Sequence, residues 1–338
     1  MNAMARPRSE AKAPITIGLV NNMPDAALLA TERQFMRLVE PASEAGDVRW
    51  RLFYLPEIAR GAVARMQISA RYAPIDALPQ AGIDALIVTG CEPIKPSLAD
   101  EPYWPSLVRL IEWSKTSTLS TIWSCLAAHA AVLHLDGVVR EKLPEKLVGV
   151  YAFEPVSKHP LLRGITEPVH VPHSRLNGLE AADLAECGYE LLTHSREAGV
   201  DAFAKKYESL FVFLQGHPEY EVDSLYREYR RDLTRYVAGQ QQKCPALPQH
   251  YFDRQASRAL TAFSEQARSA RSAAILEHFP LIEADRLSRA DWHASAARFF
   301  ANWIGYIAAA KAERTRAAPE SVAAPRRRRS LAERADLI

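Results

Sequence analysis

The chain has 338 residues, of which 48% are hydrophobic and 24% are charged. These proportions are typical of a folded globular protein and exclude wholesale disorder and a collagen-like or coiled-coil architecture. The 42 basic and 40 acidic residues leave a net charge of +2, which provides no general attraction to nucleic acid or to an anionic membrane surface.

The first part of the chain predicts a parallel sheet with crossover helices. Residues 1–13 are polar and are expected to be disordered. Four short apolar runs predict strands, at Ile15–Val20, Val48–Tyr54, Ala85–Thr89 and 121–123. Apolar residues at helical spacing predict a helix between the first two strands, and Pro105 is placed to start another. This alternation indicates an α/β catalytic domain over residues 14–240, with a mainly parallel sheet flanked by helices.

Residues 126–133 follow the fourth strand directly and consist of good helix formers. Prolines and glycines then recur over 138–209 and predict loops and hairpins around the edge of a site. Further strands are expected at 190–193 and Leu210–Leu214, and further helices at 224–235, 255–274 and 292–310.

The last two of these helices predict a C-terminal helical extension over residues 241–310, packed on the same domain. Residues 311–338 are rich in alanine and charge and contain four consecutive arginines, Arg326 to Arg329. Little of this segment can be buried, so we expect a flexible basic tail.

The four cysteines, Cys91, Cys125, Cys187 and Cys244, are widely scattered. This spacing suits neither a disulfide-dense secreted scaffold nor a paired zinc site, so we predict reduced thiols and no metal. The N-terminal stretch has no apolar signal region, and no segment approaches the ~18 apolar residues that span a bilayer. A cytoplasmic protein without membrane contact is expected.

Cys125 falls at the turn between the strand at 121–123 and the helix that follows it. The positive end of a helix dipole favours the thiolate form of a cysteine, which is the nucleophilic form. The backbone N–H of Leu126 can also point at a carbonyl oxygen under attack. A small buried cysteine without chemistry is the alternative when this feature stands alone.

A second signal lies at the end of the strand Leu210–Leu214. Gly216 allows a sharp change of direction there, and the proline after His217 enforces an extended or turn geometry. Glu219 can turn back toward the imidazole and hold its orientation, as the third member of a catalytic triad does. A strand-end His-x-Glu combined with a strand-to-helix cysteine favours nucleophilic catalysis over a surface histidine.

This arrangement resembles the class I glutamine amidotransferase superfamily, whose flavodoxin-like fold carries a Cys-His-Glu triad. Further segments narrow the resemblance, among them Asn22-Met23-Pro24, Thr89-Gly90, Tyr103-Trp104, Pro172-His173-Ser174-Arg175 and Glu228-Tyr229-Arg230-Arg231-Asp232. In order and spacing, from about residue 15 to about residue 307, they look like the homoserine O-succinyltransferase and O-acetyltransferase family of the methionine pathway.

The resemblance implies roles for six residues. Cys125 would be the nucleophile, His217 the general base and Glu219 the residue that orients it, and Lys146, Ser174 and Arg231 would lie in the substrate pocket. For acyl transfer by Cys125, we expect backbone N–H groups near Gly90, Cys91 and Leu126 to hold the oxyanion. The resemblance also implies succinyl-CoA or acetyl-CoA and L-homoserine as substrates, no cofactor, and a homodimer.

The chain departs from the family pattern at two informative positions. The position associated with acyl choice, glutamate in acetyl users and glycine in succinyl users, falls on about Ile94, so neither signature is present. The absence of an acidic residue there favours succinyl-CoA weakly. His129 lies one turn beyond Cys125 and is expected to be a wall or helix residue, not a second base.

Two alternatives stay open at this point. One is a glutamine amidotransferase or related hydrolase with the same triad, and the other is an acyltransferase that acts on a related amino-alcohol such as serine.

Overall fold

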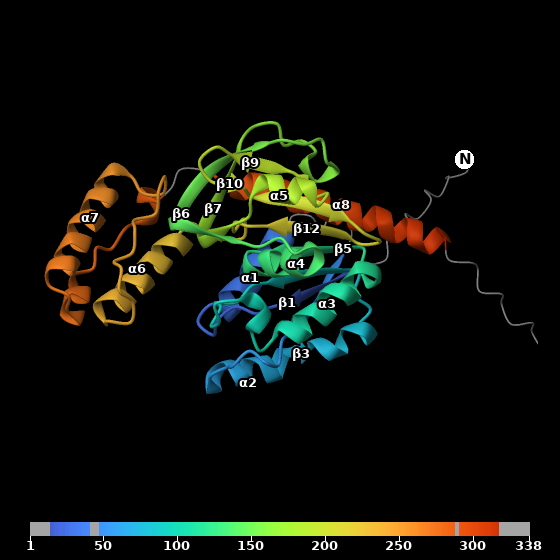
Figure 1. Cartoon of the computed structure of the whole chain (residues 1–338), viewed down its shortest axis with the longest axis horizontal. Helices are drawn as coiled ribbons and strands as arrows, with labels where there is room; N and C mark the ends of the chain where they lie inside the picture. Colours follow the sequence, from blue (N-terminus) through green and yellow to red (C-terminus); the bar gives the residue numbers. More distant parts are fainter. Residues whose placement is uncertain (1–13, 41–46, 288–290, 318–338) are drawn as a thin grey trace, which may run out of the picture.

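The computed structural model describes residues 14–40, 47–287 and 291–317 (Figure 1). Its centre is an eight-stranded sheet with the strand order β3-β2-β1-β4-β5-β12-β11-β8. Six strands run parallel: β1 (Ile15–Val20), β2 (Val48–Tyr54), β3 (Tyr72–Pro74), β4 (Ala85–Thr89), β5 (Ser120–Ser124) and β12 (Leu210–Leu214). β11 (Ala202–Lys206) is antiparallel to both of its neighbours, β12 and β8 (Glu190–Leu191). The predicted mainly parallel sheet is confirmed.

Helices cover both faces of this sheet, because alternate strand residues point to opposite sides. On one face α1 (Leu28–Val39) and α8 (His293–Ala317) bury a cluster that includes Ile17 and Ile87. On the other face α3 (Trp104–Ser117) and α4 (Leu126–Asp136) pack over Leu86 and Val88. Near the β3 edge lies α2 (Ala62–Arg71), a short helix that the sequence analysis did not predict.

A second sheet of four strands lies above the first and has the order β10-β9-β6-β7. It consists of β6 (Glu141–Pro155), β7 (Val169–Gly178), β9 (Thr193–Ser195) and β10 (Gly199–Val200), and the short helix α5 (Ala181–Glu186) follows β7. The expected hairpin is present, but β6 and β7 are far longer than their prolines suggested. Pro144 lies where the β6–β7 register shifts, between Lys142 and Leu147, so it removes no ladder hydrogen bond.

The C-terminal helices go to two different places. α6 (Ser224–Val237) and α7 (Arg254–Ser269) pack against each other and form a small core of their own beside the two sheets (Figure 1). α8 returns to the main sheet, where Trp303 is fully buried and donates a hydrogen bond from Nε1 to Ser120 Oγ at 2.8 Å.

The last helix extends further than predicted, because α8 continues to Ala317 and not to residue 310. Lys311 explains part of this extension, since its Nζ lies 2.6 Å from the Asp84 carboxylate and 2.7 Å from the Pro14 carbonyl oxygen. Residues 1–13 and 318–338, expected to be disordered and flexible, lie outside the described residues. No helix in the described ranges has the length and hydrophobicity needed to cross a membrane.

Candidate active site

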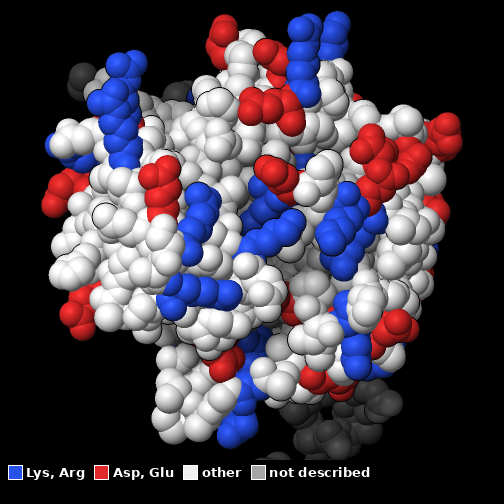
Figure 2. All heavy atoms as spheres, turned by 60° about the vertical axis from the view of Figure 1, so that its left-hand side comes forward, with Lys and Arg blue, Asp and Glu red and all other residues white. Residues whose placement is uncertain are grey.

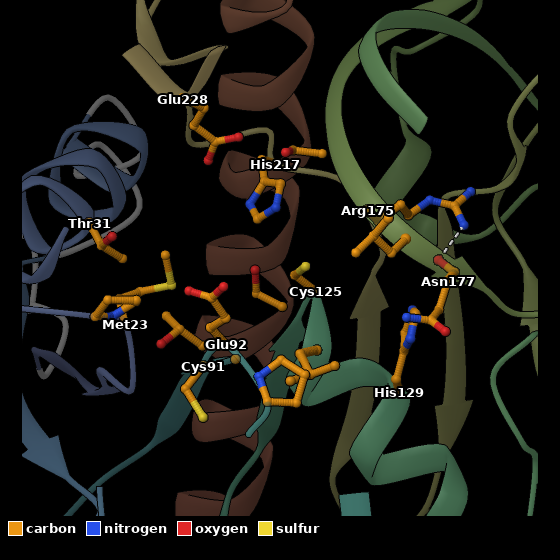
Figure 3. A pocket seen from close by; sticks show the side chains of 18 of the residues that line it. Met23, Thr31, Cys91, Glu92, Cys125, His129, Arg175, Asn177, His217 and Glu228 are labelled. Atoms are coloured by element: carbon orange, nitrogen blue, oxygen red, sulfur yellow. Dashed lines mark hydrogen bonds between the residues drawn. The ribbon is translucent and has the colours of Figure 1, made fainter. Parts of the chain in front are cut away.

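A cavity of about 260 Å³ opens at the carboxyl ends of the parallel strands (Figure 3). The chain runs outward from β1 through β2 to β3 and then resumes on the other side of β1 with β4, so the strand order reverses there. Such reversal points create the crevice in which open α/β sheets bind ligands. All nine residues named from the sequence line this cavity: Gly90, Cys91, Cys125, Leu126, Lys146, Ser174, His217, Glu219 and Arg231.

Cys125 occupies a strained turn between β5 and α4. Its φ of 52° and ψ of −117° are unusual for a residue with a side chain, and its N–H donates to the Leu214 carbonyl oxygen at 2.7 Å. This hydrogen bond ties the turn to the end of β12, the strand that leads to His217. A strained strand-to-helix turn is the geometry that presents a nucleophile at the top of an α/β sheet.

His217 lies beside Cys125 at the tip of β12 (Figure 3). Its Nδ1 is 2.9 Å from Glu219 Oε1, its ring stacks on Tyr220 at 4.2 Å, and its N–H donates to the Pro172 carbonyl oxygen at 2.8 Å. Burial alone would lower the pKa of His217, but the negative charges of Cys125 and Glu219 and their hydrogen bonds raise it well above its ordinary value. Cys125 and Glu219 thus stabilise the imidazolium form of His217.

The end of β4 approaches the start of α4 so closely that only glycine fits. A Cβ atom at Gly90 would lie 2.6 Å from Leu126 Cβ and 2.9 Å from the Leu126 backbone nitrogen. The backbone of β4 therefore meets the first N–H groups of the helix directly beside Cys125. Two backbone segments converging on one point can form an oxyanion hole.

Two cationic side chains, Lys146 and Arg231, line another part of the cavity, and both pair with Asp232. Lys146 Nζ lies 2.8 Å from one carboxylate oxygen of Asp232, and the Arg231 guanidinium lies 2.8 Å from the other. Nearby, Glu228 Oε1 accepts a hydrogen bond from the Tyr220 hydroxyl at 2.7 Å. Glu228 Oε2 is buried without a hydrogen-bond partner among the residues that the structure describes. Glu228 and Asp232 belong to the sequence motif, but the motif alone predicted no role for either.

Asp201 is a buried carboxylate behind the His217 turn that the sequence analysis missed. Its Oδ1 accepts the Gly216 N–H at 2.7 Å and lies 3.4 Å from His173 Nε2. Burial raises the pKa of Asp201 to about 6. Nothing local marks this aspartate, because its importance depends on three segments that meet only in the folded chain.

His129 lines the cavity, as expected of a wall residue. Its Nε2 is 3.0 Å from Gln215 Oε1, and burial lowers its pKa to about 3. Ile94 is 75% exposed and does not line the cavity, and its N–H donates to Glu101 Oε1 at 2.7 Å. The described residues contain no cluster of three or more His, Cys, Asp or Glu arranged to hold a metal ion.

The chain is similar to known proteins over most of its length. A family model described as homoserine O-succinyltransferase matches residues 1–314. The homoserine O-succinyltransferase of Rhodopseudomonas palustris is 49% identical over 297 residues, which is 88% of this chain and 89% of that protein. That of Bradyrhizobium japonicum is 48% identical and covers 87% of this chain and 90% of its own. Among solved structures, a glutamine amidotransferase from Thermotoga maritima aligns with 87% of this chain and 98% of its own, at 11% identity and a TM-score of 0.47.

Proposed function

The chain belongs to the homoserine O-succinyltransferase family, and we propose that it transfers a succinyl group from succinyl-CoA to the γ-hydroxyl of L-homoserine in methionine biosynthesis. The observation that carries the proposal is the placement of Cys125, His217 and Glu219 in one cavity that also holds the cations Lys146 and Arg231. The triad accounts for acyl transfer through a thioester, and the cations suit substrates that carry carboxylates.

In the first half-reaction, the Cys125 thiolate attacks the thioester carbonyl of succinyl-CoA. The carbonyl oxygen becomes an oxyanion, which backbone N–H groups at Gly90, Cys91 and Leu126 are placed to stabilise. The tetrahedral intermediate collapses, the carbon–sulfur bond to CoA breaks, and the His217 imidazolium donates its proton to the departing sulfur. Succinyl-Cys125 and free CoA result.

In the second half-reaction, homoserine enters and neutral His217 removes the proton of its γ-hydroxyl. The oxygen attacks the succinyl-cysteine carbonyl, and collapse of the second tetrahedral intermediate expels the Cys125 thiolate. The products are O-succinylhomoserine and the starting enzyme, with His217 again an imidazolium. Glu219, 2.9 Å from His217 Nδ1, orients the ring and stabilises its charged form in both steps.

We assign the amino-acid group of homoserine to the cluster around Asp232. The Arg231 guanidinium is a planar fork that matches a carboxylate, and Asp232 holds both it and Lys146 in place. The unpaired oxygen of Glu228 suits the ammonium group. Ser174 lines the same cavity and supplies a hydroxyl to either substrate.

The surface around this end of the molecule suits an anionic co-substrate. Figure 2 shows the molecule with its α6 and α7 side turned forward. Lys and Arg side chains gather near the centre of this face. The phosphate groups of CoA are recognised by such side chains. From the family resemblance we further expect a cytoplasmic homodimer that works without a cofactor.

Intact-protein mass spectrometry with succinyl-CoA tests the proposal. The wild-type protein should gain the mass of one succinyl group and lose it again when homoserine is added, with O-succinylhomoserine as product. Cys125→Ala should form no adduct. Cys91→Ala is the matched control, because Cys91 lines the same cavity, and it should keep the adduct.

Two results would overturn the proposal. One is an adduct that persists on the Cys125→Ala protein. The other is a wild-type protein that ignores succinyl-CoA and hydrolyses glutamine, the reaction of an amidotransferase with the same triad. Serine in place of homoserine tests whether the acceptor is a shorter amino-alcohol.

A further inference from the structure

Arg140 lies in the segment between α4 and β6, and neither the sequence motifs nor the proposed mechanism assigns it a role. Its side chain lines the cavity that contains Cys125. It is also close enough to the Cys125 sulfur for the two charges to influence each other. An arginine in this position faces the place where the acyl group of a thioester must lie.

The guanidinium of Arg140 differs from those of the other two arginines that line the cavity. Arg175 donates to the carbonyl oxygens of Asn177 and Ala198 at 2.9 and 2.6 Å, and Arg231 is paired with Asp232. Within the described part of the chain, Arg140 forms no hydrogen bond and no ion pair. A partly buried guanidinium without a partner is unfavourable, and it becomes favourable when an anion binds to it.

Glu101 is the carboxylate whose charge acts on Arg140, but its hydrogen bonds go to other groups. Glu101 is 2% exposed, and its Oε1 accepts the N–H groups of Ile94 and Lys95, each at 2.7 Å. Glu101 therefore holds the loop after β4 and offsets part of the charge of Arg140 through space without pairing with it. The N–H donors of the Arg140 guanidinium therefore remain available to a ligand.

The proposed reaction brings two carboxylates into this cavity, and the cavity holds two distinct cationic groups. The carboxylates that act on Arg231 are those of Glu228 and Asp232, and Asp232 is paired with it. The acidic groups that act on Arg140 include Glu101 and Cys125, which lie in another part of the chain. One cationic group can thus serve the amino acid and the other the acyl group.

We propose that Arg140 binds the free carboxylate of the succinyl group and thereby selects succinyl-CoA over acetyl-CoA. This inference rests on the proposed function and names the residue that determines the acyl donor. The succinyl carboxylate lies two methylene groups beyond the carbonyl carbon that Cys125 attacks. An acetyl group ends at the first carbon and leaves Arg140 unpaired in the complex.

The test compares the rate of Cys125 acylation by succinyl-CoA, butyryl-CoA and acetyl-CoA. Butyryl-CoA has the chain length of succinyl-CoA with a methyl group in place of the carboxylate. Arg140→Met should lower kcat/KM for succinyl-CoA by about 30-fold to 300-fold, because it removes a charge-assisted pair. The rates with acetyl-CoA and butyryl-CoA should change by less than about 3-fold, since neither donor makes that pair.

Two further variants make the comparison specific. Arg140→Lys keeps the charge and should recover part of the rate with succinyl-CoA. Lys142→Met is the matched control, because Lys142 is a cation two residues further along the chain that is exposed and does not line the cavity. It should leave all three donors unchanged.

Three outcomes would overturn the assignment. Equal losses with all three donors would mean that Arg140 only supports the fold. A raised KM for homoserine with normal succinylation would place Arg140 on the acceptor side. A wild-type enzyme that uses butyryl-CoA as well as succinyl-CoA would show that no residue selects the carboxylate. In each case transfer to homoserine by the wild type would persist, whereas its absence would overturn the proposed function itself.

Discussion

Cys91 and Cys125 line the same cavity but differ in their chemical surroundings. Burial raises the pKa of Cys91, whose thiol also has Tyr103 as a hydrogen-bond partner. Cys125 instead faces His217, whose pKa is raised well above its ordinary value by Cys125 and Glu219 although burial lowers it. A cysteine near a substrate is a nucleophile only when its proton has a place to go, so the imidazole decides between the two.

His217 and Glu219 should differ in how much activity their loss removes. His217→Asn removes the proton acceptor of both half-reactions and should lower the rate of acylation by about 10³-fold or more. Glu219→Gln keeps a hydrogen-bonding side chain but removes the negative charge that raises the pKa of His217, and should cost about 10-fold to 100-fold. Stopped-flow acylation by succinyl-CoA measures both variants.

The pH dependence of Cys125 alkylation tests the role of Glu219 independently of the rates. Because Glu219 raises the pKa of His217, Glu219→Gln should move the loss of the imidazolium to lower pH, which alkylation of Cys125 by iodoacetamide across a pH series would reveal. A Glu219→Gln enzyme weaker than His217→Asn, or one with an unshifted profile, would contradict the roles assigned here.

Among single residues, the sequence predicts functional side chains best where they lie close to the end of a predicted strand. Cys125 follows β5 directly, His217 comes shortly after the end of β12, and strand ends in a parallel sheet converge. Arg140 and Asp201 could not be predicted in this way. Arg140 lies in the connection between α4 and β6 and lines the cavity only in the folded chain, and Asp201 reaches Gly216 from the connection between β10 and β11.

The turn from β5 to α4 depends on a close contact with a neighbouring strand. The backbone of Gly90 at the end of β4 touches Leu126, the first residue of α4. This contact brings the N–H groups that we propose to bind the oxyanion close to Cys125. The end of β4 and the start of α4 must therefore keep their relative positions, because a shift of either one would move these N–H groups away from the Cys125 sulfur.

Gly90→Ala should therefore impair chemistry more than binding. Its Cβ would lie 2.6 Å from Leu126 Cβ, so the helix start must shift, and acylation should slow by about 10²-fold to 10³-fold, the effect of losing one oxyanion donor. The KM for succinyl-CoA should change little. Gly305→Ala is the control, since a Cβ there meets nothing within 4 Å and alanine favours a helix. An unimpaired Gly90→Ala enzyme would remove this contact from the mechanism.

Whole elements were predictable where burial alone determines them. The strands β1, β2, β4 and β12 begin and end at the predicted residues. β1, β4 and β12 are short apolar runs, whereas β2 alternates arginine with apolar residues. β6 and β7 were underestimated, since their prolines and glycines look like breaks when a residue's partner strand is unknown. α8 extends beyond the predicted end because its last turns are fixed by Lys311 and Asp84, which are 227 residues apart.

At the scale of the whole molecule, the proposed site draws on two hydrophobic cores. The sheets hold Cys125 and His217, whereas Arg231 and Asp232 lie on α6, which has a separate core with α7. The division into a catalytic domain over 14–240 and an extension over 241–310, and the homodimer, remain predictions. That division keeps α6 in the catalytic domain, although α6 packs with α7 of the extension. The proposed acyl chemistry thus lies on the main sheet and the proposed acceptor cluster partly on α6.

This division predicts that the two cores affect different half-reactions. Phe263 is 4% exposed and packs edge-on against Phe279 at 5.3 Å in the α6–α7 core. Phe263→Leu should lower stability by about 1–2 kcal/mol and let α6 move. Arg231 and Asp232 move with that helix, so the KM for homoserine should rise several-fold while acylation by succinyl-CoA stays near normal.

Phe300→Leu is the matched change on the main sheet. Phe300 is fully buried on α8, 5.9 Å from the ring of Trp303, and should lose a similar amount of stability when shortened. Because α8 carries none of the cavity residues, the KM for homoserine should stay unchanged in this variant. Thermal unfolding and half-reaction kinetics on both proteins check the pair. Equal effects on homoserine would mean that the two cores behave as one unit, and acceptor binding would then depend on overall stability and not on α6.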